Sequence, residues 1–225
     1  MKLIANNAGG QTVILAASES IDSVPESHLD MLTPAVRQAF ADPSAWFQSL
    51  ATRSQIPELA QWLTRLIEGG QWRLLLHEGF MYERSTLAAF YWHSAKVQSA
   101  MISLPRDSLS PRMPQGFHHY YSLVDVVHWD AYGSAGGLLG SQDQIPLAAF
   151  STPRPKRKGF DPRKCVVWGN SMCGDMLIYT EAGKAGFLSH ENGKVQLLGT
   201  IEEALAWVFR QLLENRTPEF DYSRA

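Results

Sequence analysis

A serine at position 171 lies in a segment that resembles a nucleophile motif. Residues 169–173 read Gly-Asn-Ser-Met-Cys, one residue short of the Gly-x-Ser-x-Gly elbow that presents a catalytic serine between a strand and a helix. Here the residues that follow predict a strand, and no oxyanion hole, histidine or acid can be placed around the serine. We therefore expect Ser171 to form a turn between two strands. A serine hydrolase is the less favoured alternative.

Two cysteines raise the question of a metal site. Cys165 and Cys173, together with Asp175 and His190, supply ligand types that bind zinc. Closed zinc sites usually place paired cysteines about two to four residues apart, whereas seven residues separate these two. Two cysteines are also too few for the disulfide framework of a small secreted protein. We predict reduced thiols, no metal, no cofactor and a cytoplasmic location.

Three histidines form a second candidate set of ligands. His118 and His119 are adjacent, and His128 follows a short distance along the chain. On a helix, side chains at adjacent positions point about 100° apart, so at most one of the pair can share a site with His128. We expect these histidines to pack in the core or lie on the surface.

A glycine-rich segment spans residues 133–140 and reads Gly-Ser-Ala-Gly-Gly-Leu-Leu-Gly. Such a sequence can cradle a phosphate, but a phosphate loop would continue with Lys and Ser or Thr between a strand and a helix. Neither feature is present. We predict a flexible loop, with Leu138 and Leu139 tucked under the sheet.

The densest run of charge, which we call the basic segment, spans residues 154–164. Its cations are interleaved with prolines: Arg154, Lys156, Arg157, Lys158, Arg163 and Lys164. Charged runs usually lie in water, so a solvated loop leading into a strand at Val166 is the first interpretation. Binding to an acidic protein surface is the second. The contact residues would be Arg154, Lys156, Arg157 and Lys158, with Gly136 and Gly137 of the glycine-rich segment.

The composition disfavours several classes of protein. With 45% hydrophobic and 19% charged residues, a chain of 225 residues can bury a core and form one or two domains. A net charge of −2 provides no broad cationic field for nucleic acid phosphates. Residues 1–12 show no export signal, and no apolar stretch of about 18 residues is present. We therefore expect neither nucleic acid nor a membrane as a partner.

Residues 1–102 are predicted to form a mostly helical α/β region. The pattern indicates a hairpin, two helices that begin after Thr33 and break at Asp42-Pro43, a third helix, a strand and a last helix. In that order, these elements fall at residues 2–17, 34–50, 57–67, 72–77 and 85–101.

A proline-rich stretch at residues 103–114 is the best linker candidate, because Pro105, Pro111 and Pro114 are separated by Asp and Ser. We place a domain boundary there, between residues 1–102 and 103–225. The alternative, that the two regions form one compact unit, remains open.

After the linker the pattern predicts an antiparallel meander followed by one helix. Short apolar runs fall at residues 166–168, 176–179, 186–188 and 195–198. The Asn192-Gly193 pair predicts a tight type I′ turn. Thr200 and Glu203 have the spacing of a capping box, so a helix should run to about Leu213 with its apolar face on the sheet. The chain is therefore predicted to be an α+β protein with a mainly antiparallel sheet flanked by helices.

Short motifs within residues 113–213 follow the order of one known family. Met113 to Leu123 is similar to its opening Leu-Pro helix, and Ile145-Pro146 to its strand with an Ile-Pro pair. Trp168 to Tyr179 resembles its block of strand, glycine turn, Gly-Asp and strand. Gly193 to Trp207 resembles its closing strand and helix. On these motifs the chain resembles the SUKH superfamily, which includes fungal cell-wall-synthesis regulators and many bacterial toxin-immunity proteins.

The resemblance implies a non-catalytic protein-binding domain with a SUKH-like sheet. The expected function is that of a bacterial immunity protein, which neutralises a cognate toxin in the cytoplasm by direct binding. A regulatory scaffold of the cell-wall-regulator type is the alternative. The resemblance does not cover residues 1–102.

Overall fold

The computed structural model shows an α+β protein with a mainly antiparallel sheet, which confirms the predicted fold class. It describes residues 2–5, 11–16, 18–68, 71–77, 87–94, 97–106, 109, 113–129, 136–171 and 173–223. None of the helices in this part of the chain combines the length and the apolar character that crossing a membrane requires.

The described part of the N-terminal region combines strands with helices. It begins with the hairpin of β1 (Lys2–Ala5) and β2 (Gln11–Ala16), then the 3₁₀ helices η1 (Ile21–Ser23) and η2 (Glu26–Met31). Next come the helices α1 (Pro34–Ala41), α2 (Pro43–Arg53) and α3 (Pro57–Ile67). It ends with the strands β3 (Gln71–His77), β4 (Leu87–Ser94) and β5 (Val97–Ser103). The region is richer in strand than the sequence predicted.

The C-terminal region contains the predicted meander and helix. It opens with α4 (Gln115–Tyr121), the short strands β6 (Val127–His128), β7 (Gly137–Leu138) and β8 (Ile145–Pro146), and the 3₁₀ helix η3 (Leu147–Ala149). The meander follows as β9 (Cys165–Asn170), β10 (Met176–Thr180), β11 (Lys184–Leu188) and β12 (Val195–Thr200), and α5 (Ile201–Leu213) comes last. The predicted strands and their antiparallel pairing are confirmed.

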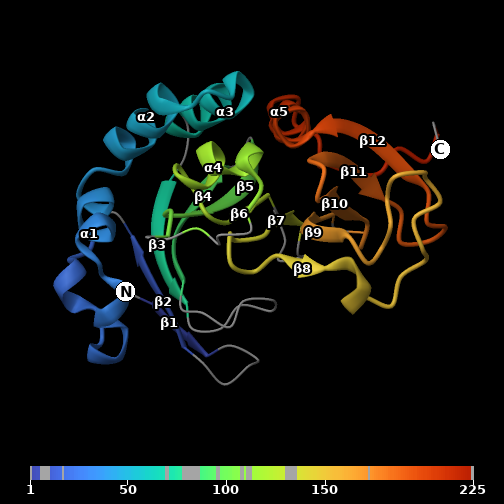
Figure 1. Ribbon diagram of the computed structural model, residues 1–225. Coiled ribbons are helices and arrows are strands. Elements are labelled where there is room, and N and C mark those ends of the chain that lie inside the picture. The colour runs from blue at the N-terminus through green and yellow to red at the C-terminus, as the bar shows by residue number, and fades with distance from the viewer. Residues whose placement is uncertain are drawn as a thin grey trace.

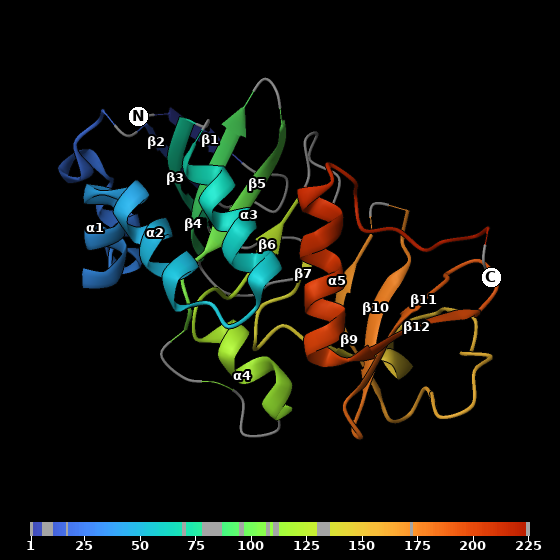
Figure 2. The ribbon, with the colours of Figure 1, turned by 90° about the horizontal axis from the view of Figure 1, so that it is seen from above.

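All the strands that the structure describes belong to one sheet. Its order is β1-β2-β3-β4-β5-β6-β7-β9-β10-β11-β12, with β8 paired to β9. Figure 1 shows the N-terminal strands at one end of the molecule, β12 at the other, and α2, α3 and α5 along one side. In Figure 2, α5 lies between α3 and the C-terminal strands. The largest core cluster extends beneath these helices, from Val13 in β2 to Phe220 near the C-terminus.

Side-chain caps and prolines explain where the N-terminal helices begin. Thr33 Oγ1 accepts a hydrogen bond from the amide of Val36 at 3.3 Å, and Asp42 Oδ1 accepts one from the amide of Ala45 at 2.9 Å. A proline opens each helix, where the backbone amide would have no intrahelical partner: Pro34, Pro43 and Pro57. The predicted starts and the break at Asp42-Pro43 are confirmed.

The helix predicted for residues 85–101 is wrong, because the described part of this segment belongs to β4 and β5. Phe90 of β4 pairs with Leu74 of β3 on one side and with Ile102 of β5 on the other. Phe90 and Ile102 lie in the main core, whereas Ala89 and Met101 lie in a small cluster on the other face. A strand buried on both faces reads as a continuous apolar run, which periodicity alone cannot distinguish from a buried helix.

The start of the predicted linker is held firmly in the fold. The amide of Ser103 donates to Val126 O at 3.0 Å, and Arg106 reaches the carboxylates of Asp125 and Asp143 at 2.6 and 2.7 Å. The sheet and the main core both continue across the proposed boundary. Residues 107, 108 and 110–112 of the linker lie outside the described residues.

Helix α5 begins in the capping box that the sequence predicted. Thr200 Oγ1 accepts from the amide of Glu203 at 3.2 Å, and Glu203 Oε2 accepts from the amide of Thr200 at 2.7 Å. The predicted apolar face is buried, and its Phe209 ring lies 5.3 Å from the Trp62 ring of α3 and 6.1 Å from the Tyr120 ring of α4. Helix α5 therefore joins helices from both regions.

A histidine at the junction of the two regions should make stability depend on pH. His119 of α4 is half-buried, and its Nε2 accepts a hydrogen bond from the amide of Gln55 at 2.8 Å. Burial, and secondly the charge of Arg53, lower the pKa of His119 from its ordinary value of 6.5. The unfolded chain therefore takes up a proton at a higher pH than the folded chain does, and stability falls as the pH drops below about 6.5.

We expect this loss of stability to be smaller in His119→Gln, which cannot be protonated. Urea midpoints of both proteins, measured at steps from pH 7.5 to 5, test the prediction. Parallel pH profiles for the wild type and the variant would show that His119 does not contribute.

Candidate functional site

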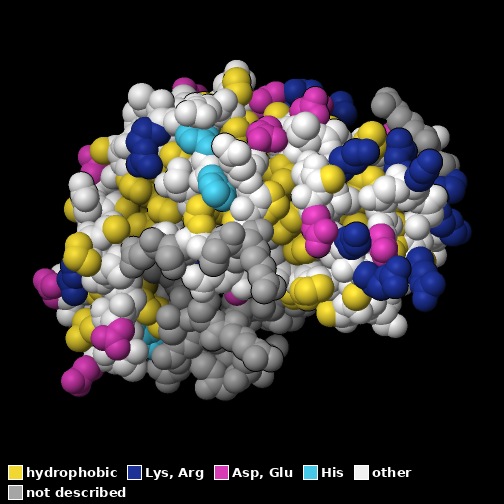
Figure 3. All heavy atoms as spheres, viewed as in Figure 1, with side chains coloured by type: hydrophobic (Ala, Val, Ile, Leu, Met, Phe, Trp, Pro, Cys, Tyr) yellow, Lys and Arg dark blue, Asp and Glu magenta, His cyan; other side chains and the backbone are white. Residues whose placement is uncertain are grey.

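The basic segment lies on the surface at the end of the molecule that the meander forms. Figure 3 shows Lys and Arg side chains gathered there, near the segment that joins β8 to β9. All the cations of the segment are exposed, as expected for a solvated loop: Arg154, Lys156, Arg157, Lys158, Arg163 and Lys164. The surface that they form is opposite in sign to the net charge of −2 on the whole chain.

A buried aromatic residue anchors this exposed segment. Phe160 is only 3% exposed and packs in a second core cluster with Leu147, Val167 and Ile178. Gly186 of β11 leaves room for it, because a Cβ there would lie 3.2 Å from the Phe160 ring. The basic segment is therefore fixed to the sheet at its centre, although it contains no helix or strand.

The turn between β11 and β12 holds the basic segment at a second point. Lys156 N donates to Gly193 O at 2.7 Å, and Arg157 Nη1 lies 3.5 Å from Val195 O. Gly193 has a φ of +72° and packs so closely on Arg154 that a side chain would collide with the Arg154 backbone. A glycine is required here for its conformation and for this contact.

The geometry of this turn differs from the predicted one. A type I′ turn would need positive φ at Asn192 as well, but Asn192 is not among the described residues with that conformation. Instead, Ser189 N donates to Lys194 O at 2.9 Å across a wider turn, and Asn192 Oδ1 accepts from Lys194 N at 2.8 Å. Asn192 therefore stabilises this wider turn through its side chain and does not adopt the backbone conformation of a type I′ turn.

Most of the cations on the basic segment are available to a partner. Hydrogen bonds from the Arg163 backbone and then from its guanidinium lower the pKa of Asp161, so Arg163 is already engaged. Five cations of the basic segment form no ion pair with a residue that the structure describes: Arg154, Lys156, Arg157, Lys158 and Lys164. The first four of these are the cationic contact residues that the sequence indicated.

Two hollows flank the basic segment. One, of about 510 Å³, is lined by Arg154 and Arg163 and by Thr152, whose buried hydroxyl has no hydrogen-bond partner among the described residues. The other, which we call the β12 groove, measures about 530 Å³. It lies between the basic segment, β12 and the C-terminal tail and is lined by Lys156, Arg157, Lys194, Gln196, Leu197 and Asp221 among others.

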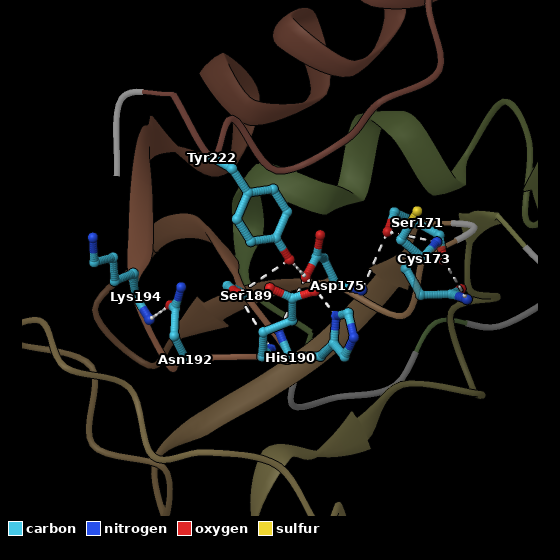
Figure 4. Close-up of polar contacts among 10 residues, drawn as sticks. Ser171, Cys173, Asp175, Ser189, His190, Asn192, Lys194 and Tyr222 are labelled. Atoms are coloured by element: carbon cyan, nitrogen blue, oxygen red, sulfur yellow. Dashed lines mark hydrogen bonds and ion pairs between the residues drawn. The ribbon is translucent and has the colours of Figure 1, made fainter.

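A buried carboxylate supports the turn that holds the basic segment. Asp175 is 1% exposed, and its Oδ1 accepts hydrogen bonds from the amide of His190 at 2.9 Å, from His190 Nδ1 at 2.8 Å and from Tyr222 OH at 2.9 Å. Ser189 Oγ lies 3.2 Å from the same tyrosine oxygen. Figure 4 shows these side chains converging on Asp175. The cluster ties together the start of β10, the β11–β12 turn and the C-terminal tail.

Ser171 has the surroundings of a turn residue. It is 1% exposed, and its Oγ accepts hydrogen bonds from the amides of Cys173 at 3.2 Å and Asp175 at 3.1 Å. Among the described residues, His190 is bonded to Asp175 and not to Ser171. The serine, histidine and acid are neighbours in Figure 4, but they are not connected in the order that a catalytic triad requires.

The candidate metal ligands do not converge in the part of the chain that the structure describes. No group of three or more His, Cys, Asp or Glu residues there could hold a metal ion. Cys165 is buried at the start of β9, where burial raises its pKa to about 11, whereas Cys173 is exposed beyond the other end of that strand.

The three candidate histidines are likewise dispersed. His118 Nε2 lies 3.0 Å from Met113 O, and His119 accepts the amide of Gln55. His128 belongs to β6 and is 9% exposed.

The prediction of a flexible loop at Gly136 and Gly137 is wrong. Both residues are buried, and Gly137 lies in β7 between β6 and β9. A Cβ at Gly137 would lie 2.6 Å from Val127 O, so glycine is needed for the close approach of two backbones. The side chains of Leu138 and Leu139 are buried in the two main core clusters, one in each. Residues 133–135 lie outside the described residues.

Comparison of the chain with models of protein families, with curated proteins and with solved structures finds no match.

Proposed function

We propose that this chain is a non-catalytic protein-binding protein whose basic segment holds an acidic surface of a partner protein. The observation that carries the proposal is the combination of two rigid attachment points with exposed cations that form no ion pair with a described residue, among them Arg154, Lys156, Arg157 and Lys158. Phe160 and the Gly193 contact hold the backbone that carries these charges in place, so little backbone conformational entropy is lost when a partner binds. Recognition residues concentrate on such loops, which a rigid scaffold positions.

The resemblance to the SUKH superfamily suggests the biological form of this binding. As an immunity protein, the chain would occupy the active surface of a cognate toxin in the cytoplasm and form a stoichiometric complex. The surroundings of Ser171 support binding over catalysis, because its hydroxyl is buried and already accepts two backbone amides.

We expect charge reversal on the basic segment to slow association with the toxin by about tenfold or more at low salt, because rim charges act mainly through steering. The variant replaces Arg154, Lys156, Arg157 and Lys158 with Glu. The wild-type chain should protect cells that express the toxin encoded by a neighbouring gene and should co-purify with it at equimolar ratio. Added salt should reduce the difference between variant and wild type, since the Debye length is about 8 Å at physiological ionic strength.

A charge-matched control separates a local contact from a general effect of charge. Lys156→Glu/Lys158→Glu and Lys184→Glu/Arg216→Glu change the net charge equally, and all four side chains are exposed. Only the first pair should slow binding. Survival without a complex would contradict the proposal and indicate enzymatic detoxification. A stable complex without protection would favour the regulatory scaffold.

A further inference from the structure

The β12 groove has the features of a site for one extended segment of polypeptide. It is about 530 Å³ in volume and is lined by Lys156 and Arg157 of the basic segment and by residues 195–197 of β12. Asp221 of the C-terminal tail also lines it, and its amide donates to Gln196 Oε1 at 3.1 Å. The groove is therefore assembled from three separate parts of the chain.

Strand β12 presents to this groove the side on which no described strand pairs with it. It is the last strand of the sheet order, with β11 as its neighbour. In an antiparallel ladder alternate residues turn their N–H and C=O groups outward, and the Ser189–Lys194 bond places Val195 and Leu197 in this outward set. Val195 O is contacted by Arg157, which leaves Leu197 as the next outward-facing backbone position.

The length available for pairing is short. Gly199 has a φ of +99°, the register with β11 shifts next to it, and helix α5 begins at Ile201. A bulge of this kind limits how far another strand can extend along an edge. An incoming segment can therefore pair with the backbone only near Leu197, and its side chains must supply the other contacts.

The side chains of the groove define the chemistry of that segment. Its lining includes three cations, Lys156, Arg157 and Lys194, and one carboxylate, that of Asp221. Leu197 is 46% exposed and is one of three large apolar side chains that are exposed in the described part of the chain. Figure 4 shows the Lys194 side chain extending away from the Asp175 cluster.

We infer that the β12 groove binds an extended acidic segment of the partner protein, with an apolar side chain placed between carboxylates. The carboxylates would contact Lys156, Arg157 and Lys194, and the apolar side chain would cover Leu197. Arg157 can bind a carboxylate through two parallel hydrogen bonds, which lysine cannot do. This inference rests on the proposed function, because it specifies which part of an acidic partner the chain recognises.

A labelled peptide tests the groove directly with the full-length protein. The probe is a ten-residue peptide that alternates Glu with Val, and the same peptide with Lys in place of Glu is the control ligand. Fluorescence anisotropy at low salt should show binding of the acidic peptide alone. Lys194→Glu and Leu197→Ser should each raise its Kd at least tenfold, because one reverses a groove charge and the other removes the apolar contact.

Arg163→Glu is the matched control, since Arg163 is exposed, lies on the basic segment and lines the other hollow. It should change the Kd less than twofold. If Lys194→Glu and Arg163→Glu weaken peptide binding equally, diffuse electrostatic attraction explains the binding and the groove site is ruled out. Failure of the wild type to bind the acidic peptide would also rule it out. Unfolding midpoints of the variants must match that of the wild type, as expected for substitutions at exposed positions.

The same variants separate this inference from the proposed function. If the toxin co-purifies with the wild type and equally with Lys194→Glu and Leu197→Ser, the β12 groove is not the binding site, but the proposed function stands. If the acidic peptide binds in the groove but no partner is neutralised, the groove stands and the proposed function fails.

Discussion

Arg106→Ala is expected to lower the free energy of unfolding by about 3–5 kcal/mol, the usual cost of removing one partner from a buried ion pair. Arg106 binds Asp125 at 2.6 Å and Asp143 at 2.7 Å, and the Asp125 side chain is only 1% exposed. Asp125 also accepts the amide of Ser141 at 2.7 Å, so it cannot turn toward solvent without breaking that bond. Without the guanidinium, the carboxylates of Asp125 and Asp143 would lie close together with little solvent to screen their repulsion.

The loss caused by Arg106→Ala should shrink at low pH. Burial already raises the pKa of Asp143 above its ordinary value of 3.8, although Arg106 opposes this shift. Removing the cation raises the pKa further, so the folded variant binds protons at a higher pH than its unfolded chain does. The penalty is therefore complete at neutral pH and is relieved as the pH falls through the raised pKa. Urea unfolding of the wild type and of Arg106→Ala at pH 7 and at about pH 4 measures the loss of stability at each pH.

Two further variants show whether uncompensated charge is the cause. Arg106→Lys keeps the positive charge but loses the planar fork, so its loss should be smaller than that of Arg106→Ala. Adding Asp125→Asn and Asp143→Asn to Arg106→Ala should recover part of the stability, since no buried charge is left unpaired. A loss below about 1 kcal/mol in Arg106→Ala would show that the network is solvated.

Phe209→Ala is expected to cost about 3–5 kcal/mol, the range for removing a buried phenylalanine. The side chain is fully buried and contacts Trp62 of α3 and Tyr120 of α4. Three helices from two regions meet there, so they cannot all move to fill the space. Phe209→Leu keeps most of the volume and should lose less.

A neighbouring residue provides the surface control for Phe209→Ala. Arg210 follows Phe209 on α5, and its pair with Glu58 is largely exposed on the arginine side. Arg210→Ala should therefore cost about 1 kcal/mol or less. Chemical denaturation of all three variants tests the set, and similar losses for Phe209→Ala and Arg210→Ala would show that this face of α5 is not core.

Elements defined by local signals could be predicted from the sequence. The caps at Thr33 and Asp42 and the capping box at Thr200 each involve residues no more than three positions apart. The meander is similarly local, because each strand pairs with the next along the chain. The described part of segment 85–101 could not be assigned correctly, since pairing with β3 and not a local pattern decides that it is strand.

The candidate site depends on contacts that no local pattern reveals. The cations of the basic segment were identifiable from their density, but Lys194 and Leu197 join them only because the β11–β12 turn packs on that segment. Tyr222 reaches Asp175 across 47 positions of the chain. The prediction fails at Gly137 of β7 because glycine serves both flexible loops and close backbone contacts, and the sequence alone does not separate these uses.

The sheet is narrowest in its middle, where neighbouring strands share few residue pairs, and this affects how it would respond to force. Each of the steps from β5 to β6, from β6 to β7 and from β7 to β9 consists of two residue pairs, whereas β3 and β4 are joined by seven. The N-terminal and C-terminal halves of the sheet are thus joined by only a few backbone pairs. A force applied at β12, where a partner is proposed to bind, would twist the C-terminal half of the sheet relative to the N-terminal half. The packing of α5 on α3, together with the main core that both halves share, would oppose that twist.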